Sequence, residues 1–234
     1  MYLAIDTSTD NAGLAVVAEK QVLAELNWRC HRNHSVELMP GINRLLEQAG
    51  VKLNSLNGIV VAIGPGSYNG LRVGVSTAKG LAFSLGVPLA GISTMEAAAW
   101  QYAESGLPVC PLFNAGMEEI AAAIYRQKEG RWLLLVEQHI TSAEKLCRQI
   151  KAKTIFCGDA VEAVFNQIKD SLGAKAVIPS PASRLRRVAF LAELGIKRLQ
   201  AGDCDNPASL QPIYLRRPPI TKPKRRISIN NSKE

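Results

Sequence analysis

The stretch GPGSYNGLRVGVSTAKGLAFSL at residues 64–85 is the most informative part of the sequence for predicting the fold. It follows a β-branched apolar run at 59–63, and such a run ending in Gly-Pro-Gly predicts a buried strand that stops in a tight turn. After Ser67, small residues recur at every fourth position, namely at Gly70, Gly74, Ala78 and Ala82. This period predicts a helix with a ridge of small side chains. Each glycine inside a helix costs about 1 kcal/mol relative to alanine, so we expect the ridge to serve a close approach by another segment.

A strand, a glycine-rich turn and a helix are also typical of phosphate-binding loops, because free N–H groups at the helix N-terminus attract anions. The Walker pattern requires Lys and Ser/Thr after its last glycine, but Leu71 and Arg72 follow Gly70. The dinucleotide pattern is also not met by the spacing of Gly64, Gly66 and Gly70. The sequence therefore favours a packing and partner surface, with phosphate contact as the open alternative.

Length and composition indicate one large or two small domains with a sizeable core, since 47% of the 234 residues are hydrophobic. The five cysteines show no C-x-x-C spacing, which predicts free thiols in a reducing compartment. Neither a signal-peptide pattern at the N-terminus nor an apolar run long enough to span a bilayer is found. We therefore expect a cytoplasmic protein with no membrane partner.

The formal net charge of +8 is concentrated at the end of the chain. Residues 216–234 hold seven Lys/Arg against one Glu, or +6, which leaves about +2 for the rest. Such a basic, Pro-rich tail is predicted to be disordered. It is either an arm for RNA or another polyanion or simply a solvated terminus, and it carries no aromatic residue for base stacking.

The order of predicted elements repeats once along the chain: three strands, a helix, a strand and a helix. In the first half the strands are expected at 2–5, 13–18, 22–28 and 58–63, and the helices at 35–49, 67–85 and 93–102. In the second half the strands are expected at 109–113, 120–125, 132–136 and 154–157, and the helices at 141–150, 161–172 and 183–200. Three consecutive strands at the start of each half argue against a doubly wound sheet. The pattern predicts an α/β protein of the actin-like ATPase (ASKHA) fold with two βββαβα subdomains, 1–104 and 105–215, a cleft between them, and the tail 216–234.

A partner surface is predicted on the two main helices of the first half. The first helix has an apolar stripe formed by Leu38, Ile42, Leu45 and Leu46. The second contributes the small-residue ridge and its neighbours, namely Gly70, Leu71, Gly74, Val75 and Ala78. Whether another subunit or another part of the same chain crosses the ridge remains open at this level.

Two polar clusters are candidates for binding a nucleotide or a metal ion. Asp6, Thr7 and Ser8 follow the first strand, where actin-like kinases keep a carboxylate that faces a metal or phosphate; the alternative is that they satisfy the backbone of the turn. His31 and His34 adjoin Cys30, but no further ligand group follows at a metal-site spacing, so we expect no metal here. No local signature of a nucleophile and its base is found, so no catalytic residue is assigned.

With these motifs placed, the chain resembles the TsaB (YeaZ) family, the partner subunits in bacterial threonylcarbamoyladenosine (t6A) modification of tRNA. The resemblance rests on the segments 6–9, 34–35, 64–75, 78–82 and 212–216. The chain departs from the family at Tyr68-Asn69, where Phe-Thr is usual, and at Asn114-Ala115-Gly116, where Asp-Ala-Arg is usual. The second change removes a salt-bridging pair and puts any role of that loop in doubt.

The resemblance implies a fold shared with TsaD, the catalytic subunit, and a non-catalytic subunit that binds TsaD through its first two helices. It also implies that ATP and metal belong to the partner subunits, that a TsaE-like ATPase joins a ternary complex, and that the chain forms a homodimer when alone. Contact with tRNA would come through the complex or the basic tail. The residues themselves leave one alternative, a nucleotide-dependent transferase or kinase that uses Asp6 in an inter-domain cleft.

Overall fold

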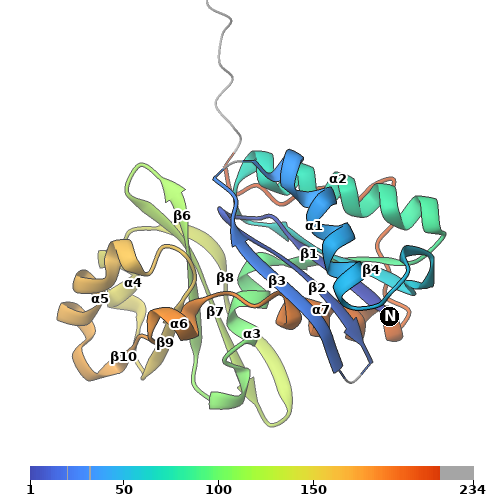
Figure 1. Ribbon diagram of the computed structural model, residues 1–234. Coiled ribbons are helices and arrows are strands. Elements are labelled where there is room, and N and C mark those ends of the chain that lie inside the picture. Colours follow the sequence, from blue (N-terminus) through green and yellow to red (C-terminus); the bar gives the residue numbers. More distant parts are fainter. Residues whose placement is uncertain (20, 32, 217–234) are drawn as a thin grey trace, which may run out of the picture.

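The computed structural model describes residues 1–19, 21–31 and 33–216, which form two five-stranded mixed sheets lying side by side (Figure 1). The first sheet has the order β3-β2-β1-β4-β5, from β1 (Tyr2–Asp6), β2 (Asn11–Ala18), β3 (Gln21–Arg29), β4 (Gly58–Gly64) and β5 (Leu89–Ser93). The second has the order β8-β7-β6-β9-β10, from β6 (Val109–Gly116), β7 (Glu119–Lys128), β8 (Arg131–Thr141), β9 (Thr154–Cys157) and β10 (Ala176–Val177). In each sheet the first three strands pair antiparallel and the last two join in parallel. This confirms the predicted α/β class and the actin-like ATPase fold.

Helices α1 (His34–Gln48) and α2 (Tyr68–Leu85) cover one face of the first sheet, and α7 (Val188–Gln200) covers the other (Figure 1). The alternation of side chains along β1 produces this sandwich, because successive residues of a strand face opposite sides. Leu3 and Ile5 pack with α1 and α2, whereas Ala4 between them packs with α7. The first sheet is therefore buried on both faces, as its nearly continuous apolar strands require.

The second sheet is covered in the same way. Helices α4 (Ala143–Gln149) and α5 (Phe165–Leu172) pack on one face, around the fully buried Phe156. Helix α3 (Thr94–Trp100) packs on the other, where Met95 meets Phe113. Within the described residues, no helix is long and apolar enough to cross a bilayer.

The last part of the second predicted subdomain packs on the first sheet, which corrects the predicted boundaries. Helix α7 lies against β1 and β4, and Asp205 pairs with Leu89 at the edge strand β5. Farther on, the Ile213 N–H donates to the Ile63 carbonyl oxygen at 2.7 Å. Residues 105–215 are therefore not one packed unit, because their final third returns to complete the first half. Of the tail predicted at 216–234, all but Arg216 lies outside the described residues.

The helix predicted at 183–200 is two helices, α6 (Pro181–Arg184) and α7, separated by residues 185–187. Ser180 caps α6, and Pro181 occupies its first position. Helix α1, predicted to begin at residue 35, begins at His34 after Asn33, without a side-chain cap. The break at 185–187 matters because Arg186 lies in it.

Candidate functional site

The side chains predicted to form a partner surface lie inside the chain. Seven of them are at most 5% exposed, namely Leu38, Ile42, Leu45, Leu46, Leu71, Val75 and Ala78, and Gly70 and Gly74 are buried as well. They belong to the core between the two helices and the first sheet. The prediction that these side chains meet another subunit is wrong for the folded chain, because the apolar stripe of a helix that lies on a sheet faces that sheet.

The β1–β2 turn of the same chain packs against the small-residue ridge of α2. A Cβ atom added at Gly70 would collide with the Thr7 carbonyl oxygen, and one added at Gly74 would collide with Thr7 Oγ1. Thr7 Oγ1 donates to the Gly70 carbonyl oxygen at 2.7 Å, and the Ser67 N–H donates to the Ser8 carbonyl oxygen at 2.6 Å. The close approach expected from the glycines is therefore internal, and it fixes the turn against the start of α2.

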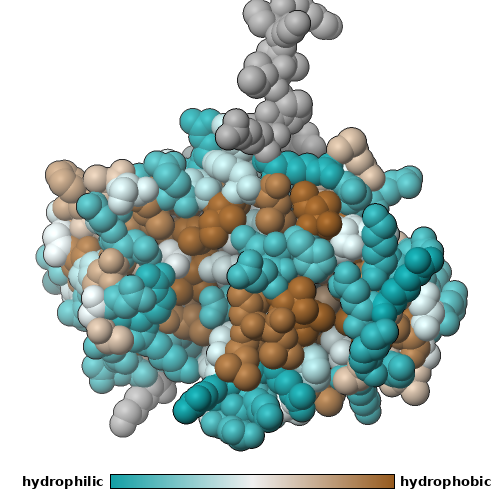
Figure 2. All heavy atoms as spheres, turned by 180° about the vertical axis from the view of Figure 1, so that it is seen from behind, coloured by the Kyte–Doolittle hydropathy of each residue, from teal (hydrophilic) through white to brown (hydrophobic). Residues whose placement is uncertain are grey.

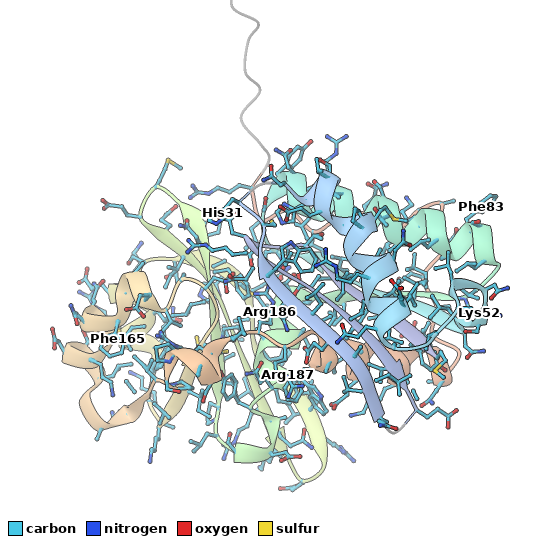
Figure 3. All side chains as sticks on the ribbon, in the orientation of Figure 1. His31, Lys52, Phe83, Phe165, Arg186 and Arg187 are labelled. Atoms are coloured by element: carbon cyan, nitrogen blue, oxygen red, sulfur yellow. The ribbon has the colours of Figure 1, made fainter. Side chains whose placement is uncertain are left out.

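The same two helices also carry large apolar side chains that are exposed to solvent. Val36 and Met39, three residues apart on α1, are exposed, the former by 73%. On α2, Phe83 is 85% exposed and projects from the outer end of the helix (Figure 3). Tyr68 at the start of α2 is also exposed, and Arg72 lies over its ring. We call Val36, Met39 and Phe83 the outer helix face.

The predicted nucleotide-facing residues are occupied by contacts within the chain. Asp6 Oδ1 accepts from the Ser8 N–H at 2.9 Å and from Ser8 Oγ at 2.6 Å. Asp6 Oδ2 accepts from Arg186 Nε at 2.7 Å. Because Asp6, Thr7 and Ser8 are each at most 1% exposed, the geometry favours the alternative that they satisfy the turn and its neighbours.

Arg186 joins the two halves of the molecule. Its side chain is 4% exposed and lies near the middle of the molecule in Figure 3. Nη2 donates to Ser8 Oγ at 3.2 Å and to Thr9 Oγ1 at 3.1 Å, while Nη1 lies 3.4 Å from Asp159 Oδ1 in the loop after β9. Burial alone would lower the pKa of the guanidinium, but Asp6 and Asp159 outweigh it and hold the pKa above its ordinary value. Arg186 is therefore a permanent cation shared by two carboxylates.

A cleft of about 680 Å³ lies beside Arg186, between the two halves. Both halves line it, through Thr9, Asp10, Asn11, Arg29, Gly66, Ser67, Phe113, Asn114 and Asp159. The cleft lies between the two halves, where a cleft was predicted, but Asp6 is not among the residues that line it. Its lining is largely polar, but Asp159 is shared with Arg186.

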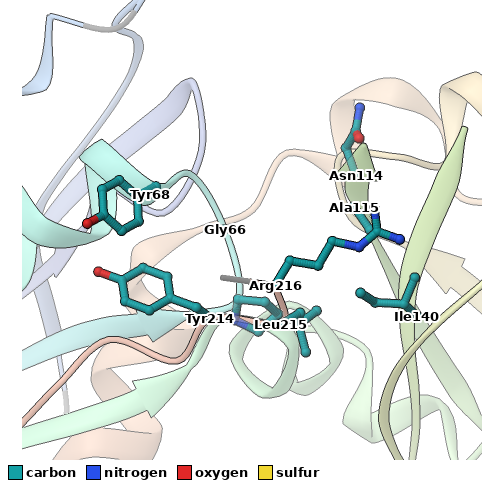
Figure 4. A pocket seen from close by; sticks show the side chains of 9 residues that line it. Gly66, Tyr68, Asn114, Ala115, Ile140, Tyr214, Leu215 and Arg216 are labelled. Atoms are coloured by element: carbon teal, nitrogen blue, oxygen red, sulfur yellow. The ribbon is translucent and has the colours of Figure 1, made fainter. Parts of the chain in front are cut away.

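A smaller cavity of about 130 Å³ adjoins the glycine turn (Figure 4). Tyr68 and Tyr214 line it with their rings 5.0 Å apart, and Asn114 and Arg216 lie across from them. Asn114 Oδ1 accepts from the Gly116 N–H at 2.7 Å, which stabilises the β6–β7 turn locally. The turn at Asn114-Ala115-Gly116 is thus held by its own hydrogen bond, and Arg216 pairs with Glu119.

His34 anchors the start of α1 to the β1–β2 turn. Its Nε2 lies 2.9 Å from the Thr9 carbonyl oxygen and 3.0 Å from Cys30 Sγ, and the ring is buried. His31 is exposed and has a positive φ of 43°. Across the described ranges, no group of three or more His, Cys, Asp or Glu residues is arranged to hold a metal ion.

Sequence reasoning assigned no role to Arg186 or to Asp159. Arg186 stands among Arg184 and Arg187 in a segment predicted to be helical, and nothing local distinguishes it. The available signal was indirect: an Asp stands at or just after a strand end in each half, and a carboxylate that becomes buried there, as Asp6 does, requires a partner.

The fold and the cleft between its halves define an α/β protein of the actin-like class. The family model described as "TsaD: tRNA N6-adenosine threonylcarbamoyltransferase" matches residues 28–218. The chain is 35% identical over 217 residues to the tRNA threonylcarbamoyladenosine biosynthesis protein TsaB of Bacillus subtilis, covering 92% of this chain and 93% of that one. Within this class, the chain belongs to the TsaB (YeaZ) family.

Two further similarities bear on the fold. A tRNA N6-adenosine threonylcarbamoyltransferase of Geotalea uraniireducens is 33% identical over 112 residues, which is 41% of this chain and 33% of that enzyme. The crystal structure of a Pseudomonas aeruginosa protein with similarity to peptidase YEAZ superimposes with a TM-score of 0.79 at 24% identity, covering 92% of this chain and 99% of that chain. At that sequence identity the structural similarity supports the fold alone.

Proposed function

We propose that this chain acts in t6A biosynthesis as a non-catalytic subunit that binds a TsaD-like catalytic subunit. Membership of the TsaB family supports the pathway, since the relative with 35% identity bears the name of a threonylcarbamoyladenosine biosynthesis protein. Similarity to a threonylcarbamoyltransferase over part of the chain supports pairing between two related folds. Related subunits often join through equivalent surfaces around a two-fold axis.

The outer helix face carries this proposal. Val36 and Met39 of α1 and Phe83 of α2 are large apolar side chains exposed on two adjacent helices. Their inward neighbours are committed to the core, so the outward side chains are the ones available to a partner. Exposed apolar groups on a packed helix pair suit a helix-to-helix contact with another subunit.

The contacts of Asp6 do not support the alternative of an ATP site on this chain. Both carboxylate oxygens already accept hydrogen bonds from Ser8 and Arg186. A metal ion bound by Asp6 would have to displace the buried guanidinium of Arg186. We propose that ATP and metal are bound by the partner subunits, as the family resemblance implies.

Binding of a TsaD-type subunit to purified variants tests the proposal. Met39→Glu and Phe83→Glu should each weaken binding at least about tenfold, because they bury a charge in an apolar contact. Leu134→Glu, on the exposed strand β8, is the matched control and should bind like the parent chain. All three should melt close to the parent chain. The proposal fails if both helix variants are folded and bind as tightly as the control.

A homodimer of the isolated chain, a TsaE-like third subunit and tRNA contact complete the proposed assembly. The homodimer would use the outer helix face, so Phe83→Glu should also convert it to monomer in sedimentation. The basic residues from Arg217 onward are the candidate contact with tRNA phosphates. A chain ending at Arg216 should then bind tRNA more weakly within the complex, with a flatter dependence on salt. Unchanged affinity and salt dependence would remove the tail from the proposal.

A further inference from the structure

Two exposed tyrosines lie in contact beside the start of the basic tail. Tyr68 opens α2, and Tyr214 lies near the end of the described chain, yet their ring centroids are 5.0 Å apart (Figure 4). Each of the two residues is 37% exposed. Two aromatic rings from distant parts of the chain therefore meet at the surface, where part of each ring remains open to solvent.

Arginine side chains flank this pair of rings. Arg72, one helical turn after Tyr68, donates from Nη1 to the Tyr68 hydroxyl at 3.0 Å and places its guanidinium carbon 5.3 Å from the ring centroid. Arg216 lines the same cavity as both rings and pairs with Glu119. In the sequence, residues 217–234 then add six Lys/Arg against one Glu. The aromatic pair therefore stands between a guanidinium fixed on α2 and a strongly basic stretch of sequence.

Exposed rings beside cations suit a single strand of RNA. Its unpaired bases stack on aromatic side chains, and its phosphates pair with guanidinium and ammonium groups. The cavity of about 130 Å³ beside the rings is bordered by Gly66 and Asn114, so a flat group can approach the rings there. A protein partner could also bury the two tyrosines, but the run of cations that follows them matches a polyanion.

We propose that Tyr68 and Tyr214 form a stacking site for an unpaired base of RNA, with Arg72 and Arg216 on the flanking phosphates. The inference rests on the tRNA contact proposed above, and it names the residues that add base stacking to a contact otherwise made by charge. The base lies against the rings where they border the cavity, and the basic stretch holds the strand that leads to it. The outer helix face does not line this cavity, so the two surfaces can be tested separately.

Binding of the isolated full chain to a fluorescein-labelled oligoadenylate of about ten nucleotides, followed by fluorescence anisotropy, tests the stacking. Tyr68→Ala and Tyr214→Ala should each raise the Kd about fivefold or more, because a base loses the ring on which it stacks. Tyr68→Phe and Tyr214→Phe keep the ring and should bind within about twofold of the parent chain. Arg72→Gln should weaken binding and reduce the slope of log Kd against log salt by about one, whereas the tyrosine variants should leave that slope unchanged.

Arg148→Gln is the matched control for charge, because Arg148 lies exposed on α4 in the other half and pairs only with Glu144 at the surface. It should leave both the Kd and the salt slope unchanged. In a chain that ends at Arg216 the affinity should fall, but Tyr214→Ala should still raise the Kd by the same factor. Should an alanine variant melt well below the parent chain, Tyr68→Leu or Tyr214→Leu keeps apolar bulk without a flat ring.

Three results would overturn this inference. The first is that the parent chain does not bind the oligoadenylate at low salt, and the second is that folded alanine variants of both tyrosines bind it like the parent chain. The third is that Tyr214→Ala leaves RNA binding intact and instead weakens binding of a TsaD-type subunit, since the rings would then belong to a protein interface. That third result would leave the proposed function standing, whereas a failure of the outer helix face alone would leave the stacking site standing.

Discussion

Helix α1 and strand β8 each contain three leucines, but those of α1 are buried and those of β8 are exposed. Leu45 and Leu46 of α1 are at most 5% exposed. Leu133, Leu134 and Leu135 of β8 are all exposed, with Leu134 at 50%. The surface seen from behind likewise carries hydrophobic side chains near its centre (Figure 2). Apolar composition alone therefore does not decide burial in this protein.

The difference lies in the pattern and in the position of each element. The apolar residues of α1 recur with the helical period and form one stripe, which a single sheet face can bury. The leucines of β8 are consecutive in a strand, so they point to alternating sides. Strand β8 is also the last strand of its sheet, where fewer neighbours cover it. A stripe that matches its element is buried, whereas a run at a sheet edge stays exposed.

The largest expected effect compares one leucine from each region. Leu45→Ala should lower the free energy of unfolding by about 2–5 kcal/mol, because it leaves a cavity among fully buried neighbours. Leu134→Ala should change it by no more than about 0.5 kcal/mol. Urea denaturation of both variants measures the contrast. Equal losses would mean that β8 is covered in solution, for example by another copy of the chain.

A smaller effect on stability distinguishes the inner face of α2 from its outer face, because the same substitution should have opposite signs on the two faces. Gly74→Ala should destabilise the chain by about 1–3 kcal/mol, because the new methyl group collides with Thr7 Oγ1. Gly80→Ala should stabilise it by about 1 kcal/mol, since no atom lies within 4 Å of the added Cβ and alanine favours the helix. Thermal melts of the two variants give the signs. A stabilised Gly74→Ala would contradict the close approach of the β1–β2 turn.

The smallest effect concerns reactivity and not stability. Of the five cysteines, Cys204 is exposed and the other four are buried. Burial raises the pKa of the Cys110 and Cys157 thiols well above the ordinary value, which suppresses their thiolate forms. A disulfide reagent at pH 8 should therefore modify one thiol rapidly in the native chain and five after denaturation. A second rapid thiol would show that a buried face opens on that timescale.

The local sequence determined the order of elements and much of their chemistry. The β-branched run before Gly64 became β4, the small residues after Ser67 became one face of α2, and Ser93 caps α3. These features depend on residues within about four positions of one another, so periodicity and capping rules suffice to predict them. The duplicated βββαβα order followed from the same local patterns, and with it the actin-like fold.

The tertiary structure alone decided what each surface faces and how the halves are joined. The glycine ridge could have met a subunit, but it meets Thr7, which lies more than sixty positions away. The segment predicted as one helix at 183–200 breaks, and the break delivers Arg186 to Asp6 across 180 positions. Local patterns do not predict such pairings. The free energy of a buried ion pair depends on which distant groups surround it once the chain has folded.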